Sequence, residues 1–196
     1  MIYPDYFVIH DVVRSVKADQ KKTFLLHSQN EPVEQGDIFS FDEEQGRLFC
    51  RTFLPHDYVR TKVGGPGKEF WIENRNYHLG KTRIEEYKKR YGDKYKDLKW
   101  GNWRVELTAK GDRKENEYLN LIQVGLKKDT SAMVPSKMIR SKGMTGVEFT
   151  AKDGTLWSVL FTADGKGGRI KAVRKGKVIV DKPLTNGVQK QKPFQK

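Results

Sequence analysis

Hydrophobic and β-branched positions recur along this chain in short runs, and most of these runs alternate with polar positions. A period of two residues is typical of strands with one buried face. The runs are bounded by Gly, Asp and Asn, which favour turns. The strands predicted in the first two thirds of the chain cover residues 6–9 with 12–13, 22–27, 37–42, 47–54, 58–63, 103–107 and 118–124.

The last third of the chain has the pattern of consecutive hairpins. Asp153-Gly154 separates two predicted strands, and Lys175-Gly176 separates two more. Asp-Gly between alternating runs is a strong signal for a tight hairpin turn. The strands concerned cover residues 147–152, 155–162, 169–174 and 177–180. Short strands at this spacing predict an all-β protein, an antiparallel β-sandwich.

One segment departs from the strand pattern. Residues 80–99 hold 8 basic and 4 acidic residues. Ile84, Tyr87 and Tyr91 fall at the spacing of one helix face. Gly92 suits the end of a helix. The sequence therefore predicts a short helical or irregular insertion between strands, which covers an edge of the sandwich.

Charge is distributed unevenly along the 196 residues. The net charge is +13, and residues 140–196 hold 13 basic and 4 acidic residues. We expect one β-sandwich domain over residues 1–182 and a flexible basic tail over 183–196. Such a basic protein favours polyanionic partners: nucleic acid, anionic lipid or acidic polysaccharide. A solvated basic face without a specific partner is the alternative.

The chain shows few signs of targeting or redox chemistry. Its first residues lack a basic start and an apolar run, so no signal peptide is predicted. No stretch approaches the roughly 20 apolar residues of a membrane span, and we expect none. The single cysteine, Cys50, lies in a predicted strand, where we expect a buried and inert thiol.

The glycine-rich stretch VGGPGKEFW, residues 63–71, suggests a phosphate loop at first sight. A phosphate loop requires Ser or Thr after Gly-Lys, whereas Glu69 follows Gly67-Lys68 here. The chain also lacks the dinucleotide fingerprint, a pair of cysteines, the H-E-x-x-H zinc motif and the G-x-S-x-G elbow. We therefore predict no cofactor, no metal site and no catalytic residue.

Basic, aromatic and amide side chains flank this glycine-rich stretch. Lys and Arg bind carboxylate or sulfate, Trp and Tyr offer flat rings, and Asn donates to hydroxyls. This combination suits an acidic sugar chain. The candidate carbohydrate-binding residues are Arg60, Lys62, Lys68, Trp71, Asn76 and Tyr77. The alternative is a loop at the rim of the sandwich with Trp71 in the core.

The order of several segments resembles the C-terminal β-rich part of heparinase II/III-like polysaccharide lyases. The resemblance covers about residues 4–162 and is strongest over 47–77. No single motif is diagnostic, but the ordered set is moderately specific. The segments are Phe24–Ser28, Arg47–Pro55, Val63–Trp71, Asn76-Tyr77, Gly101–Glu106 and Tyr118–Val124.

The resemblance implies a role beside a catalytic domain. These enzymes join an N-terminal α/α toroid to β-sandwich domains and cut uronate-containing polysaccharides by β-elimination. The toroid supplies most catalytic residues, and a histidine-rich metal-binding stretch lies upstream of the region that resembles this chain. Neither is found in this sequence. The resemblance thus implies a non-catalytic, carbohydrate-binding C-terminal domain that supports the upstream catalytic domain.

The resemblance also implies a ligand and a compartment. The ligand would be an acidic polysaccharide of the glycosaminoglycan type, such as heparin or heparan sulfate. The parent enzyme would be periplasmic or secreted. We expect the isolated chain to be catalytically inactive.

Three alternatives remain open at this stage. The first is a nucleic-acid or generic polyanion-binding module, although no recognised nucleic-acid motif is present and nucleic acid is the less favoured partner. The second is a purely structural scaffold in which Trp71, Trp103 and Trp157 form core. The third is an intact enzyme with His27 and Tyr77 as base and acid.

Overall fold

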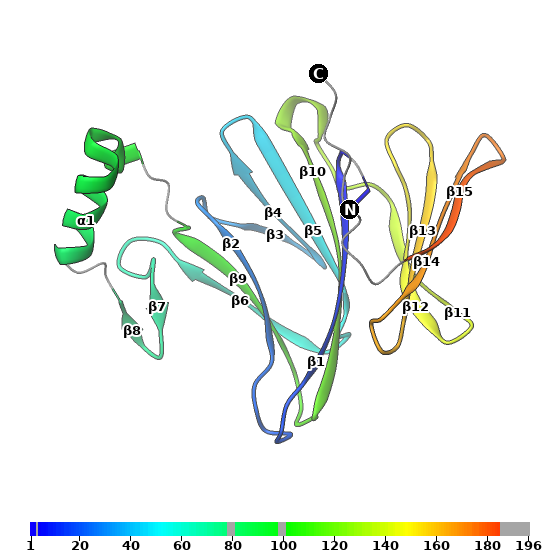
Figure 1. Cartoon of the computed structure of the whole chain (residues 1–196), viewed down its shortest axis with the longest axis horizontal. Helices are drawn as coiled ribbons and strands as arrows, with labels where there is room; N and C mark the ends of the chain where they lie inside the picture. Colours follow the sequence, from blue (N-terminus) through cyan, green and yellow to red (C-terminus); the bar gives the residue numbers. More distant parts are fainter. Residues whose placement is uncertain (3, 78–80, 98–100, 185–196) are drawn as a thin grey trace.

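The computed structural model describes residues 1–2, 4–77, 81–97 and 101–184. Figure 1 shows β-sheets in successive layers, with a helical segment at one end of the molecule. Every strand pairing in the described residues is antiparallel. The predicted fold class, an all-β antiparallel sandwich, is confirmed.

The middle layer is a five-stranded sheet, which we call the central sheet. Its long strands β1 and β10 lie side by side, and β5 follows (Figure 1). In spatial order its strands are β1 (Tyr6–Arg14), β10 (Glu115–Leu126), β5 (Gly46–Leu54), β4 (Ile38–Glu43) and β3 (Val33–Gln35).

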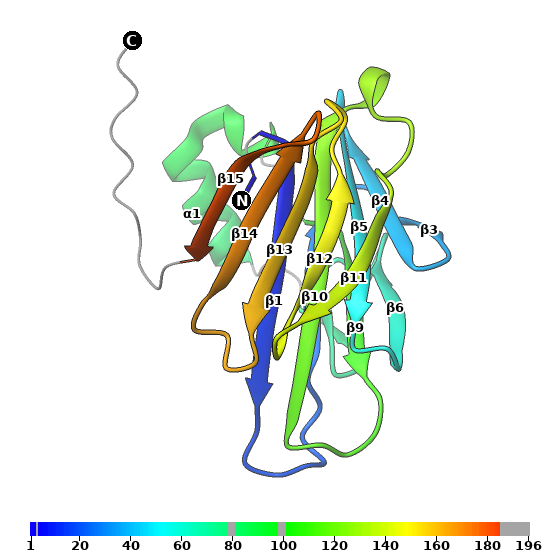
Figure 2. The same cartoon turned by 90° about the vertical axis from the view of Figure 1, so that its right-hand side faces the viewer.

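A second five-stranded sheet, the C-terminal sheet, covers one face of the central sheet. Figure 2 shows its strands in front of β1, β10 and β5. It is a meander in which each strand pairs with the next along the chain. Its strands are β11 (Ser136–Ser141), β12 (Met144–Thr150), β13 (Leu156–Thr162), β14 (Gly168–Arg174) and β15 (Lys177–Leu184).

A three-stranded sheet, the side sheet, packs on the other face of the central sheet. Its order is β2 (Thr23–Ser28), β9 (Trp103–Ala109) and β6 (Tyr58–Gly64). The remaining elements are the hairpin of β7 (Trp71–Ile72) and β8 (Arg75–Asn76), the helix α1 (Lys81–Tyr91), and the 3-10 segments η1 (Gly92–Asp97) and η2 (Lys127–Asp129).

Two separate apolar clusters hold the layers together. Toward the C-terminal sheet, the buried residues include Tyr6, Leu119, Leu121, Val147, Phe149 and Val159. Toward the side sheet, they are Phe39, Cys50, Val105, Leu107 and Ile122. The central sheet is therefore covered on both faces.

Strand β10 shows why the central sheet takes the middle position. Leu119 and Leu121 face the C-terminal sheet, whereas Ile122 faces the side sheet. A strand buried on both faces reads as a nearly continuous apolar run. One buried polar side chain of β10, Asn120, is half paired. The Thr52 hydroxyl donates to Asn120 Oδ1 at 2.8 Å, whereas Asn120 Nδ2 has no hydrogen-bond partner among the described residues. The bond to Thr52 offsets part of the cost of burying this amide.

The predicted hairpins and insertion are also observed. β12 and β13 meet around Asp153-Gly154, and β14 meets β15 at Lys175-Gly176, where both turn residues have positive φ. Helix α1 ends at Tyr91, and Gly92 has φ +57°. The sequence pattern missed β3, β7, β8 and β11. Strand β15 includes residues 183 and 184 of the predicted tail, and the rest of that tail lies outside the described residues.

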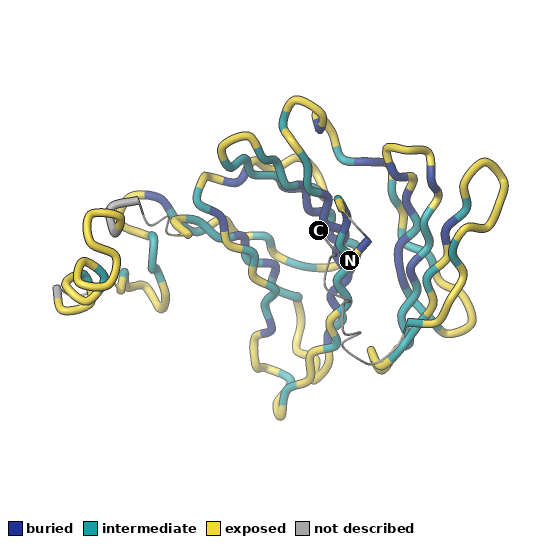
Figure 3. Tube along the Cα trace, turned by 45° about the horizontal axis from the view of Figure 1, so that its top comes forward, coloured by how far each residue is buried: buried dark blue, intermediate teal, exposed yellow. Residues whose placement is uncertain are grey.

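The β7–β8 hairpin and α1–η1 form a projection that we call the arm, residues 65–77 and 81–97. The arm lies at the far end from the C-terminal sheet (Figure 1), and its trace is largely exposed (Figure 3). In α1 only Ile84 and Tyr87 are half-buried among the residues whose burial is described. The sequence predicted that this helix covers an edge of the sandwich. The helix instead exposes most of its surface to solvent.

Candidate functional site

The glycine-rich stretch that follows β6 approaches Trp103 closely. A Cβ atom on Gly64 would lie 2.3 Å from the Asn102 carbonyl oxygen and 2.6 Å from Trp103 Cα. A Cβ on Gly65 would lie 2.8 Å from the Trp103 ring. Both glycines have positive φ, which other residues rarely adopt. These glycines therefore allow the backbone after β6 to lie against the Trp103 side chain.

Arg60 and Lys62 lie on the inner face of β6 and are bound within the chain. Arg60 Nε lies 3.3 Å from Glu34 Oε1, and Arg60 Nη2 donates to the Gly36 carbonyl at 2.6 Å. Lys62 Nζ donates to Glu31 Oε1 at 2.5 Å and lies 5.7 Å from the Trp103 ring centroid. Both cations thus join the side sheet to the edge of the central sheet near β3.

Asn76 also has a structural role. Its Oδ1 accepts a hydrogen bond from the Phe70 backbone N–H at 2.9 Å, and its Nδ2 donates to Glu69 Oε2 at 3.1 Å. The other Glu69 oxygen accepts from the Gly67 backbone N–H at 3.1 Å. These bonds fix the entry to the β7–β8 hairpin.

Lys68, Trp71 and Tyr77 are the candidate residues that present surface on the arm. Lys68 Nζ lies 5.4 Å from the Trp71 ring centroid, and Arg75 Cζ lies 5.1 Å from that of Tyr77. These distances are typical of cation–π pairs. The Tyr77 residue is 48% exposed. Of these three residues, Lys68 and Tyr77 are exposed and Trp71 is half-buried.

The helical part of the arm repeats this pairing of cation and ring. Arg90 Cζ lies 5.5 Å from the Tyr91 ring centroid, and Tyr91 stacks on Tyr87 at 5.9 Å. The sequence placed Ile84, Tyr87 and Tyr91 on one helix face, and this segment is helical in α1. Ile84 and Tyr87 are half-buried, and Tyr91 is 38% exposed.

The tryptophans and histidines differ in burial, and Trp157 packs against the apolar cluster between the central and C-terminal sheets. Trp71, Trp103 and Trp157 are half-buried. His27, the possible base of the intact-enzyme alternative, lies exposed on β2. Among the described histidines, His10 lies inside the sandwich, where its side chain is 1% exposed and stacks on Phe161 at 5.1 Å. No cluster of metal-ligating side chains occurs among the described residues.

The Cys50 thiol is fully buried in β5 and will not react in the folded protein. Burial raises its pKa well above the ordinary value, so the nucleophilic thiolate is not formed near neutral pH. Ellman's reagent should label no thiol in the native protein and one per chain in denaturant. Rapid labelling of the native protein would show that β5 opens readily or that Cys50 is accessible.

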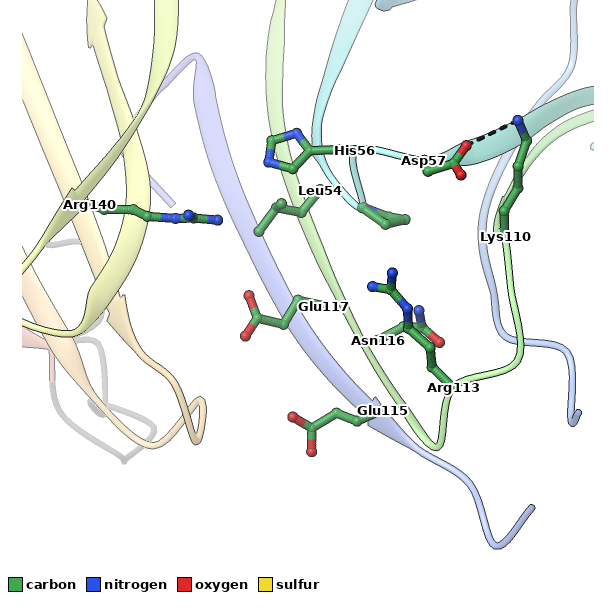
Figure 4. A pocket seen from close by; sticks show the side chains of 10 residues that line it. Leu54, His56, Asp57, Lys110, Arg113, Glu115, Asn116, Glu117 and Arg140 are labelled. Atoms are coloured by element: carbon green, nitrogen blue, oxygen red, sulfur yellow. Dashed lines mark ion pairs between the residues drawn. The ribbon is translucent and has the colours of Figure 1, made fainter. Parts of the chain in front are cut away.

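A pocket lies elsewhere, at the open end between the central and C-terminal sheets (Figure 4). Its volume is about 380 Å³. The β5–β6 loop, the β9–β10 turn, the start of β10 and strand β11 supply its walls. Sequence reasoning missed this pocket, because its residues are scattered over positions 54–57, 110–117 and 140.

No protein-family model matches this chain, and no curated protein matches it significantly. Within the described part of the chain, no helix combines the length and apolar character needed to cross a membrane.

Proposed function

We propose that this chain is a non-catalytic β-sandwich domain that binds acidic polysaccharide through its arm. The observation that carries the proposal is the repeated pairing of a cation with an aromatic ring there. Lys68 with Trp71, Arg75 with Tyr77 and Arg90 with Tyr91 all lie on the arm.

Each such pair matches two features of an acidic sugar chain. The flat ring offers an apolar face to the C–H groups of a sugar, and the cation beside it can bind carboxylate or sulfate. The net charge of +13 favours the approach of a polyanion. The exposed arm lets an extended chain reach several pairs at once (Figure 3).

The resemblance to heparinase II/III-like lyases supports the same proposal from the sequence. It makes heparin and heparan sulfate the first ligands to test, an upstream catalytic domain the partner, and the periplasm or the outside of the cell the compartment. The internal bonds of Arg60, Lys62 and Asn76 favour a supporting role for β6 and for the base of the β7–β8 hairpin.

Binding of the chain to heparin, heparan sulfate, alginate and random single-stranded DNA tests this function. We expect binding to one polysaccharide that persists at about 0.5 M salt, where exposed charge pairs are strongly screened. Trp71→Ala should weaken it about fivefold, since one stacked ring contributes on the order of 1 kcal/mol. Isothermal titration calorimetry gives the dissociation constant at each salt concentration.

A pair of charge-matched double variants separates a site from diffuse charge. Lys68→Gln with Arg75→Gln removes two charges from the arm, and Lys175→Gln with Lys177→Gln removes two from the β14–β15 hairpin. We expect the first variant to lose about tenfold or more in affinity and the second less than about twofold. Equal losses would contradict an arm site.

The scaffold alternative has a specific observation in its favour, which is the internal use of Arg60, Lys62 and Asn76. If all four polyanions bind alike and high salt abolishes binding, the domain is a scaffold with a generic basic surface. Turnover that forms an unsaturated uronate, and that is lost in His27→Ala or Tyr77→Phe, would instead favour an intact enzyme.

A further inference from the structure

We propose that the pocket between the central and C-terminal sheets binds a small hydroxycarboxylate, a molecule with one carboxylate and several hydroxyls. This site is separate from the arm and goes beyond the function proposed above. Its volume of about 380 Å³ lies in the range of small-molecule sites.

The charges that line the pocket do not all neutralise one another. Asp57 pairs with Lys110 at 3.0 Å, as the dashed line in Figure 4 shows. Glu115 pairs with Arg14. Among the described residues, neither the Arg113 nor the Arg140 guanidinium has a hydrogen bond or ion pair. Two guanidinium groups are therefore available to a ligand.

The two free guanidiniums belong to different parts of the fold. Arg140 enters the pocket from β11 of the C-terminal sheet, and Arg113 comes from the β9–β10 turn on the other side (Figure 4). Guanidinium groups bind carboxylates with paired, directed hydrogen bonds. A carboxylate in this pocket would thus be recognised by residues of both sheets.

Glu117 gives the pocket its preference for hydroxyls. Its carboxylate lines the pocket and can accept hydrogen bonds from hydroxyl groups, which a bare anion such as sulfate does not offer. Behind it lies His10, whose Nε2 is 4.0 Å from Glu117 Oε2 and whose ring nitrogens have no hydrogen-bond partner among the described residues. Glu117 therefore keeps acceptor capacity for a ligand.

An apolar wall completes the match. Leu54 and Pro55 line the pocket beside His56, and they offer contact to the C–H face of a ring. Guanidinium, carboxylate and apolar groups together suit a hydroxy acid better than a bare anion or a neutral sugar. A single uronate unit is the hydroxycarboxylate that an acidic polysaccharide would present.

An NMR titration of the ¹⁵N-labelled chain with D-glucuronate tests the site. We expect saturable shifts at the backbone amides of residues 54, 56–57, 113–117 and 140. D-glucose lacks the carboxylate, acetate lacks the hydroxyls, and sulfate is a bare anion. Each should bind about tenfold more weakly or not at all, because each loses one set of charge-assisted or hydroxyl bonds.

Matched variants then identify the residues responsible. Arg140→Gln and Arg113→Gln should each raise the dissociation constant for glucuronate about tenfold. Lys142→Gln removes a charge from the adjacent β11–β12 turn and should leave it unchanged. The spectra themselves show whether each variant folds, and two separate arginine variants keep the test valid if one does not.

Several outcomes would overturn the site. Absence of saturable shifts at these amides would do so, as would equal binding of acetate and glucuronate or unchanged affinity in both arginine variants. Shifts confined to the arm would contradict the pocket and leave the arm proposal standing. A third outcome is possible: the pocket amides shift with glucuronate, and the Lys68→Gln, Arg75→Gln double variant binds heparin as tightly as the unchanged protein. That outcome would support the pocket and contradict the arm proposal.

Discussion

Gly64→Ala should lower the free energy of unfolding by about 2–5 kcal/mol, since it combines backbone strain with overpacking. The new Cβ would lie 2.3 Å from the Asn102 carbonyl oxygen and 2.6 Å from Trp103 Cα. Both atoms belong to backbone, so neither can rotate away. The residue also has φ +151°, a conformation that side chains disfavour. Urea denaturation followed by tryptophan fluorescence measures the change.

Gly67→Ala is the matched control for that experiment. Gly67 also has positive φ, +80°, but a Cβ there would meet no atom within 4 Å. Its substitution should therefore cost only the backbone term, about 1–2 kcal/mol. Equal losses in free energy of unfolding for the two variants would show that the close contact between Gly64 and Trp103 adds no cost beyond the backbone strain.

Phe149→Ala should lower the free energy of unfolding by about 3–5 kcal/mol, the usual range for a buried phenylalanine. Phe149 is 1% exposed, and its ring lies 4.8 Å from the Tyr6 ring across the two sheets. Phe39, which is fully buried on the other face of the central sheet, should give a similar loss. Denaturant unfolding checks both values.

Together the two variants also test whether the layers unfold together. Both clusters share strands β5 and β10 through Leu54, Cys50, Leu121 and Ile122. We expect one cooperative transition in each variant. Val178→Ala is the surface control, because Val178 is 56% exposed, and it should change stability by no more than about 0.5 kcal/mol. Two separate transitions would show that the layers fold independently.

The local turns and strands followed closely from the sequence. Asp153-Gly154 and Lys175-Gly176 make hairpins with little help from distant residues, because their backbone geometry is a local preference. Gly92 ends the helical segment for the same reason. Strands such as β5 and β9 could be predicted because alternation of residue types records the two faces of a strand.

The candidate site followed only in part. Lys68, Trp71 and Tyr77 do lie together on an exposed projection. Alternation placed Arg60 and Lys62 on one face of a strand, but it could not show that this face meets the Glu31–Glu34 segment. The two cations looked available because their carboxylate partners lie about 30 positions away in the chain.

By itself, the sequence determined that this protein is an antiparallel all-β fold with a short helical insertion, since turn chemistry and strand period are properties of neighbouring residues. Only the tertiary structure decided which sheet is buried on both faces, which cations remain free, and where a pocket forms. Those features depend on segments as distant as Arg113 and Arg140, or β3 and β6. Contacts at such separation arise from packing the layers, and no local pattern encodes them.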